Sequence, residues 1–250
     1  MSAPGRPLVE VADGVWVSTS SKDSTTSTVV VEGEEALLVD PAWLPDELDG
    51  LAGELAHRNL HVAAGFSTHA HHDHLLWHPG FGEAPRWASP RTCELALEHR
   101  ADLLDLLGDW PWPESFGRVE PAPAAIPFGA EEFEAVTHDG HAPGHSALWL
   151  ASRGVLIAGD MLSDVELPLP FWPDDLPSYL QALDVLAPYV ARARVLVPGH
   201  GAPTADPMAR LDADRRYLDD TIAGRSVDDP RLGNPGMAAN HAHLVEVARG

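Results

Sequence analysis

The sequence predicts an α/β fold in which two β-sheets pack face to face and helices cover their outer faces. Strand-rich stretches are followed by helical ones, and this order occurs in two similar halves of a 250-residue chain without an exact repeat. The hydrophobic content of 44% is enough for one substantial core. We therefore predict a single domain over residues 1–250, with a core of about 10–205 and a C-terminal helical segment of about 206–250.

The first half begins with a predicted antiparallel meander, because β-rich runs alternate with short polar turns. A stretch with helical spacing of leucines follows, then a strand and a second leucine-bearing helix. The expected strands are 14–17, 27–31, 36–39, 61–68 and 85–88, and the expected helices are 45–58 and one that opens at Ser89 or Pro90 and continues to about 106.

A segment rich in Pro, Trp and Gly, residues 109–127, is predicted to be a long loop. It either covers a site or is a surface excursion held by Trp110 and Trp112. The second half repeats the style of the first. Its expected strands are 133–137, 147–151, 155–158 and 194–197, and its expected helices are 175–189, 207–223 and 235 to the end.

Charge and composition limit the partners of this chain. The formal net charge of -22 would repel a phosphate backbone, so we expect a small-molecule substrate and no nucleic acid. The N-terminus lacks the apolar core of a signal peptide, and no apolar run is long enough to span a bilayer, so we expect a cytoplasmic protein without a membrane partner. Cys93 is the only cysteine, and any metal must be held by His and carboxylates. Nothing in the sequence indicates the oligomeric state.

The strongest local signal is the run His-Ala-His-His-Asp-His at residues 69–74. His69 and His71 are two residues apart at the end of a predicted strand, so their imidazoles should point to the same side. Asp73 and His74 follow where we expect the chain to turn into a helix, and this change of period would direct them to a second point. Crowded imidazoles beside a buried carboxylate are costly without a cation, so the run indicates a metal site.

Three further candidate ligands each stand at or just beyond the end of a predicted strand, and a glycine precedes each one. They are His141, Asp160 and His200. Small neighbours let the backbone turn sharply, and loops at one edge of a sheet sandwich can converge. We therefore expect one His/Asp metal centre. Asp40, also at a strand end, is a candidate hydrogen-bond partner for a ligand imidazole, and His145 is a candidate for the pocket wall.

Together these motifs resemble the signature of the metallo-β-lactamase superfamily over roughly residues 10 to 205. The motifs are His69-x-His71-x-Asp73-His74, Gly140-His141 with Pro143-Gly144-His145, Gly159-Asp160 and Gly199-His200. The resemblance implies an αββα sandwich of two mixed β-sheets with the metals at one edge. It also implies a first metal bound by His69, His71 and His141, a second bound by Asp73, His74 and His200, and Asp160 bridging both.

Such a centre implies a dinuclear metal hydrolase. Imidazoles and carboxylates suit Zn²⁺, of which we expect two per chain, although such sites also accept Fe or Mn. A hydroxide bridging the metals would attack an ester, lactone, thioester or phosphoester-type bond, and Asp73 would be the catalytic residue that orients this nucleophile and accepts its proton. Two alternatives stay open: a mononuclear iron-dependent oxygenase acting on a thiol or persulfide, and a metal-bound binding module without turnover.

Several residues differ from the patterns of known branches of the superfamily, and these differences narrow the range of expected substrates. Asp160 argues against the antibiotic-hydrolysing branch, which generally lacks this carboxylate. The residues Leu75 to Pro79 differ from the glycines of glyoxalase-II-like enzymes, and Met161 to Asp164 differ from the segment typical of persulfide dioxygenases. The acidic charge argues against an RNA-processing relative. Five aromatic residues could shape an apolar pocket: Trp77, Trp110, Trp112, Phe171 and Trp172.

Overall fold

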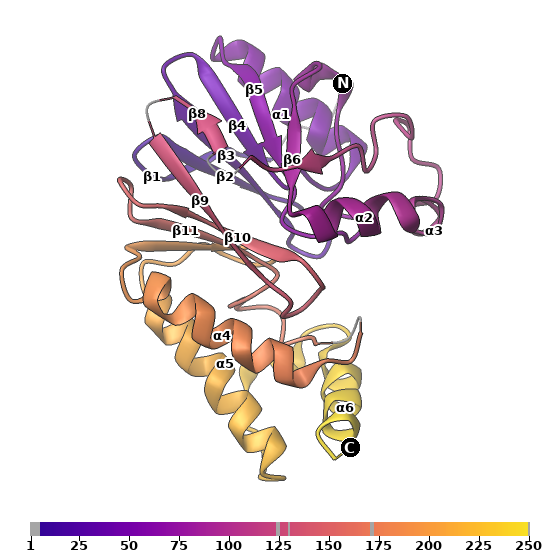
Figure 1. Ribbon diagram of the computed structural model, residues 1–250, viewed down its shortest axis with the longest axis vertical. Coiled ribbons are helices and arrows are strands. Elements are labelled where there is room, and N and C mark those ends of the chain that lie inside the picture. Colours follow the sequence, from indigo (N-terminus) through magenta and orange to yellow (C-terminus); the bar gives the residue numbers. More distant parts are fainter. Residues whose placement is uncertain (1–5, 124–125, 130, 171–172, 250) are drawn as a thin grey trace.

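The computed structural model describes residues 6–123, 126–129, 131–170 and 173–249. In the first half, a strand meander leads into alternating strands and helices (Figure 1). The elements are β1 (Val9–Ala12), β2 (Val15–Thr19), β3 (Thr26–Glu32), β4 (Glu35–Val39), α1 (Pro45–His57), β5 (His61–Phe66), η1 (Pro79–Phe81), β6 (Arg86–Ala88), α2 (Pro90–Glu98), α3 (Arg100–Leu107) and β7 (Glu120–Pro121).

The second half contains a strand meander followed by helices. Its elements are β8 (Ile126–Phe128), β9 (Glu131–His138), β10 (His145–Leu150), β11 (Val155–Gly159), α4 (Leu176–Val190), β12 (Val195–Pro198), α5 (Pro207–Ile222), η2 (Pro230–Gly233) and α6 (Met237–Val247). Aspartates cap the first turns of two of these helices: Asp175 accepts the N–H of Ser178 in α4, and Asp206 accepts that of Ala209 in α5.

Both sheets are mixed. In the described part of the chain, the first has the order β1-β2-β3-β4-β5-β6-β7, antiparallel up to β4 and parallel beyond it. The second has the order β12-β11-β10-β9-β8, with one parallel pair, β11 and β12. The parallel pairs bring the C-terminal ends of β4, β5 and β6, and of β11 and β12, to an edge of each sheet.

Three layers of apolar side chains hold four layers of backbone together. Between the sheets pack residues such as Leu37, Phe66 and Leu148. Alternate residues of the same strands face outward, so Leu38 packs under α1 while Trp149 packs under α4. Strands buried on both faces explain why the sequence shows continuous apolar runs. Figure 1 shows α1 to α3 beside the first sheet and α4 to α6 beside the second, which confirms the predicted αββα order.

Three local predictions need correction. The expected helix from Ser89 to about 106 is two helices that meet at His99, whose φ and ψ of -103° and 13° leave the helical range. The residues after His71 form turns and not a helix. The 109–127 segment is mostly irregular as expected but contributes β7 and the start of β8.

Trp110 and Trp112 fix that segment to the molecule. Both pack into the outer core of the first sheet, edge to face at 5.4 Å between ring centroids. This favours the surface excursion over a cover for the site. No helix in the described residues is long and apolar enough to cross a bilayer. The division of the chain into one domain stays a prediction.

Candidate metal centre

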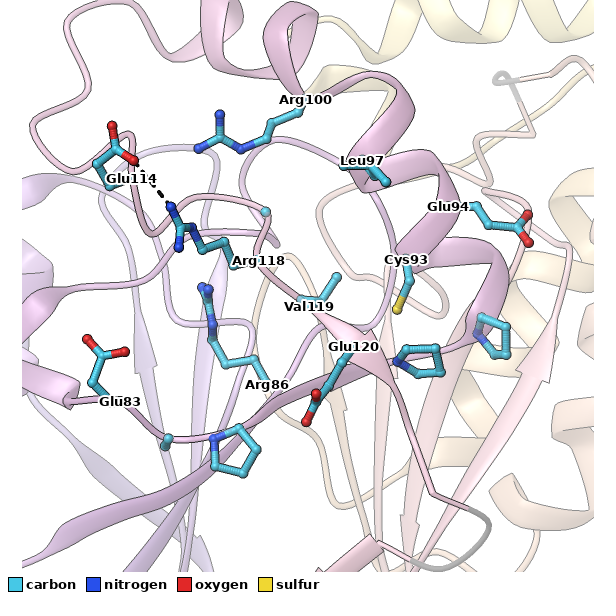
Figure 2. A pocket seen from close by; sticks show the side chains of 15 residues that line it. Glu83, Arg86, Cys93, Glu94, Leu97, Arg100, Glu114, Arg118, Val119 and Glu120 are labelled. Atoms are coloured by element: carbon cyan, nitrogen blue, oxygen red, sulfur yellow. Dashed lines mark hydrogen bonds and ion pairs between the residues drawn. The ribbon is translucent and has the colours of Figure 1, made fainter.

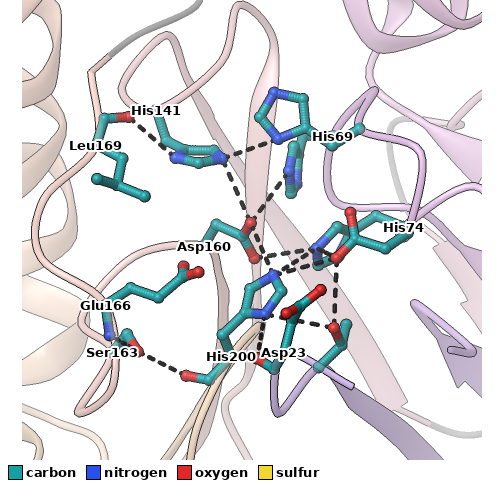
Figure 3. Close-up of polar contacts among 12 residues, drawn as sticks. Asp23, His69, His74, His141, Asp160, Ser163, Glu166, Leu169 and His200 are labelled. Carbon is teal, nitrogen blue, oxygen red and sulfur yellow. Dashed lines mark hydrogen bonds and ion pairs between the residues drawn. The ribbon is translucent and has the colours of Figure 1, made fainter. Parts of the chain in front are cut away.

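All seven predicted ligand residues come together at one edge of the sandwich. His69 to His74 lie in the turns that follow β5 of the first sheet, and His141, Asp160 and His200 follow β9, β11 and β12 of the second. Backbone contacts join the two sheets here, since Thr25 forms an isolated bridge with His200 and the N–H of Thr26 donates to Gly199. Side chains from both halves of the chain therefore share one site (Figure 3).

Two groups of candidate ligand atoms lie side by side. His69, His71, His141 and Asp160 form one, and Asp73, His74 and His200 form the other, with all ligand atoms of a group within 4.8 Å of one another. In the first, His141 Nε2 is 3.1 Å from His71 Nδ1. In the second, His200 Nε2 is 3.3 Å from both His74 Nε2 and Asp73 Oδ2.

Asp160 lies between the groups. Its Oδ2 is 3.4 Å from the Nε2 atoms of His69 and His141, and 3.3 Å from that of His200. Its Oδ1 is 3.1 Å from His74 Nε2. One carboxylate is thus in contact with both groups, as a bridging ligand would be.

Hydrogen bonds on the far side of four imidazoles fix their orientation. His74 Nδ1 lies 2.9 Å from Asp40 Oδ2, which confirms the contact expected for Asp40. His141 Nδ1 donates to the Leu169 carbonyl at 3.1 Å, and His200 Nδ1 to that of Asp23 at 2.8 Å. Such bonds keep the proton on Nδ1 and leave the Nε2 lone pair facing the centre, as metal-bound histidines require.

The fourth imidazole follows the same rule through Thr68. The Thr68 hydroxyl donates to Asp40 at 2.6 Å, so its lone pair accepts from His69 Nδ1 at 3.0 Å. His69 Nε2 then presents a lone pair to the Asp160 carboxylate. Among the described residues, His69 Nε2 and Asp160 Oδ1 are buried without a hydrogen-bond partner. Electron-pair donors without hydrogen bonds in a buried site fit a cation bound among them.

The pKa values of the site residues also indicate a place for a cation. Burial lowers the pKa of His69 to about 4, and the neighbouring His74 adds to the effect. Although burial opposes it, Asp160 and other carboxylates raise the pKa of His74 and His200 well above the usual range. Without metal, protons on His74 and His200 supply positive charge to these carboxylates, and a metal ion would displace them.

Two glycines permit this close approach. A Cβ atom on Gly199 would collide with the Asp160 carboxylate, and one on Gly159 would collide with the His145 imidazole. Gly159 also has a φ of 57°, which favours glycine. His145 lies in the wall of the site as expected: its Nε2 accepts the backbone N–H of Asp160 at 3.1 Å, and its ring stacks on His69.

The site opens into a cavity of about 290 Å³. Besides ligand candidates, its wall contains residues that the sequence did not single out: Asp23, Glu166, Leu169 and Asn240, together with His72. Asn240 comes from α6, far along the chain. Burial raises the pKa of the Glu166 carboxyl despite the nearby His200. No periodicity or motif marks these residues, because packing of distant segments brings them together.

An ion-pair network, which we call the Arg231 cluster, supports this wall and consists of Arg231, Asp214 and Asp229. Arg231 is buried and donates to Asp214 at 2.6 Å and to Asp229 at 2.9 and 3.0 Å. Its Nη1 also donates to the carbonyls of Ser163 and Glu166, each at 3.0 Å. The cluster therefore holds the segment that follows Asp160.

A larger cavity, of about 980 Å³, lies elsewhere, between α2 and β7 (Figure 2). Two of its arginines already have partners: Arg86 donates to the Ser115 carbonyl at 2.6 Å, and Arg118 pairs with Glu114 at 3.2 Å. Burial raises the pKa of the Cys93 thiol to about 11, so the thiolate is scarce at neutral pH. This cavity holds no chemistry comparable to the His/Asp site.

Three of the five aromatic residues predicted to shape an apolar pocket lie away from the site. Trp77, Trp110 and Trp112 pack in the outer core of the first sheet and are absent from the described wall of the site cavity. Phe171 and Trp172 lie outside the described residues. Leu169 is the apolar side chain that the structure places in that wall.

Comparison with known proteins yields one family. The model of the metallo-beta-lactamase superfamily matches residues 21–200, which include all seven candidate ligands. No curated protein matches the chain.

Several solved structures share the fold. A beta-lactamase domain protein from Burkholderia ambifaria is 22% identical, with a TM-score of 0.63 over 100% of this chain and 90% of that one. A metallo-beta-lactamase family protein from Thermus thermophilus is also 22% identical, with a TM-score of 0.63 over 96% and 90%. A metallo-beta-lactamase from Pontibacter korlensis is 21% identical, with a TM-score of 0.63 over 83% and 95%. Identities this low speak for the fold alone.

Proposed function

Because the chain belongs to the metallo-β-lactamase superfamily, we propose that it is a dinuclear metal-dependent hydrolase that cleaves an ester, lactone, thioester or phosphoester-type bond of a small molecule. The observation that carries the proposal is the position of Asp160, whose carboxylate contacts imidazoles of both groups at 3.1 to 3.4 Å. Asp160 would bridge two ions. His69, His71 and His141 would hold one ion, and Asp73, His74 and His200 the other.

Zinc is the metal that we propose, with iron and manganese as alternatives, since His and Asp donors suit all three. A dinuclear zinc centre, when bound, lowers the pKa of water and polarises a carbonyl or phosphoryl oxygen. The protein contributes the fixed Nε2 lone pairs and a recessed cavity. Asp73 would hold the second ion through Oδ2, which also accepts from the Thr25 hydroxyl at 3.3 Å, and would take up the proton of the nucleophile.

Metal content is the first test. Protein purified without added metal should contain two ions per chain by elemental analysis. His69→Ala and Asp160→Ala should each lower this content, because each removes a proposed ligand. His57→Ala, at an exposed histidine of α1, is the matched control and should change nothing. Unchanged content in both site variants would refute the proposed centre.

Turnover is the second test. Lactone, thioester, phosphodiester and β-lactam substrates should be screened beside oxygen consumption. Metal-dependent cleavage of one substrate class supports the hydrolase. One iron per chain with thiol-dependent oxygen uptake would instead identify the oxygenase, and two metals with no turnover would favour a binding module.

A further inference from the structure

The cavity wall outside the proposed ligands is acidic. Asp23 and Glu166 both line it, and none of the described wall residues is a lysine or arginine. The whole chain carries a formal charge of -22, so its long-range field also attracts cations and repels anions. A negatively charged substrate group would find no lysine or arginine in this described wall.

Glu166 is the most informative of these residues. It is partly buried, and no described residue donates a hydrogen bond to its carboxylate, although one of its oxygens lies within 4.8 Å of ligand atoms of Asp160 and His200. Figure 3 shows the carboxylate on the same side as those two residues. A carboxylate that lies beside another carboxylate and accepts no hydrogen bond is unfavourable unless positive charge lies close to it, and a substrate cation would add to that of His200 or of a metal bound there.

The backbone of Glu166 is held in place. Its N–H donates to the Ser163 hydroxyl at 3.0 Å, and its carbonyl accepts from Arg231. Ser163 in turn donates to the carbonyl of His200 at 2.7 Å. The Arg231 cluster and the backbone of His200 thus fix the segment that carries the Glu166 carboxylate. This segment therefore needs little rearrangement when a ligand binds.

We propose that Glu166 forms a subsite for a positively charged nitrogen, an ammonium or guanidinium group, which the substrate carries close to the bond that is cleaved. The inference rests on the proposed function, because the metal centre would hold the reacting carbonyl or phosphoryl group beside this subsite. Asp23 adds negative charge at the cavity mouth, and the Asn240 amide adds a polar contact from α6.

A competing role for Glu166 is metal ligation, since it forms a third possible group with Asp160 and His200. Both of those residues already belong to the two proposed ligand groups. On our proposal, Glu166→Gln therefore keeps the metal content of the wild type. Loss of one ion per chain in this variant would overturn the subsite and make Glu166 a ligand.

The test uses two hydroxamates that bind zinc centres and differ only in charge. One is trimethylammonioacetohydroxamate, with a permanent cation, and the other is its carbon isostere, 3,3-dimethylbutanohydroxamate. Their dissociation constants from the metal-loaded protein are measured by calorimetry for the wild type and for Glu166→Gln. The cation also changes the acidity of the hydroxamate, but it does so equally with both proteins, so the informative quantity is the change in the affinity ratio.

We expect the affinity of the cationic compound divided by that of the neutral compound to be roughly fivefold or more lower in Glu166→Gln than in the wild type. This is the effect expected for a charge pair shielded from water. Glu83→Gln, at an exposed carboxylate that lines the larger cavity in Figure 2, should leave the ratio unchanged. An equal ratio in wild type and Glu166→Gln would overturn the subsite while leaving the hydrolase intact. If neither compound binds the metal-loaded wild type, the proposed metal centre fails, and the subsite fails with it.

Discussion

Two buried polar clusters, joined by the segment from Asp160 to Glu166, are built in opposite ways. In the Arg231 cluster, the Nε, Nη1 and Nη2 atoms of the guanidinium each donate to a carboxylate. In the His/Asp site, the Nε2 lone pair of His69 faces the Asp160 carboxylate, and two buried ligand atoms of the described chain, His69 Nε2 and Asp160 Oδ1, lack hydrogen-bond partners. The first is complete with the chain's own groups, whereas the second needs a cation from outside.

The comparison distinguishes two uses of buried charge. A completed ion pair holds neighbouring segments in place, and breaking it leaves a charge without a partner. An incomplete cluster stores unfavourable contacts that a bound ion relieves, so its residues should matter more for binding than for folding. The predictions below test this division.

The largest expected effect is on stability. Arg231→Met would leave Asp214 buried beside Asp229 without its cation, and the free energy of unfolding should fall by about 3–5 kcal/mol in urea titrations at neutral pH. Arg215→Met removes an exposed pair with Asp184 and should cost less than about 1 kcal/mol. Equal losses in the two variants would contradict a structural role for the Arg231 cluster.

The next effect is on metal affinity. Asp40→Asn keeps a side chain of the same size but removes the charge that orients His74, so zinc affinity should fall by about 10- to 100-fold in competition with a chelator. Asp49→Asn is the matched control, because Asp49 pairs with His78 at 2.9 Å outside the site. The control should bind zinc as the wild type does. An unaltered affinity in Asp40→Asn would mean that His74 needs no such partner.

The smallest effect is a pH dependence at the back of the site. Burial lowers the pKa of His138 to about 4, whereas the pKa in the unfolded chain is about 6.5. Between these two pH values, the unfolded chain binds a proton at His138 and the folded chain does not. The stability that this group contributes is present above pH 6.5 and is lost as the pH falls toward 4.

Metal-free His138→Leu should therefore lose less stability than the wild type between pH 7 and pH 5, by up to about 2 kcal/mol in urea titrations. His57→Leu, at an exposed position, should keep the wild-type pH dependence. Parallel curves for His138→Leu and the wild type would show that His138 is protonated equally in both states.

The sequence predicted what depends on local pattern. Runs buried on both faces marked the strands, and a glycine before His141, Asp160 and His200 marked sharp turns at their ends. Because loops at one edge of a sheet sandwich converge, residues far apart in the chain could be placed in one site. The contact between Asp40 and His74 followed from the same reasoning.

The sequence did not predict what depends on the packing of distant segments. Glu166 lies in irregular backbone and Asn240 in a C-terminal helix beyond the matched family region, and neither has a local signal. The sequence also did not predict the break between two helices at His99 or the turns after His71, since apolar spacing says little about where a helix begins or ends. Trp77, Trp110 and Trp112 pack in the outer apolar core of the first sheet, and aromatic composition alone does not distinguish such packing from a pocket wall.

The origin of the proposed ligands in both sheets has a mechanical consequence. A chain with Cys93 as its only cysteine has no intrachain disulfide. An ion held by His69 and His141, or by His74 and His200, would cross-link segments that lie far apart in the chain, and this would restrict the unfolded ensemble as a long-range disulfide does. On the proposed assignment, zinc is a reversible cross-link between the two sheets. Slower amide exchange along β5 and β11 would accompany its binding.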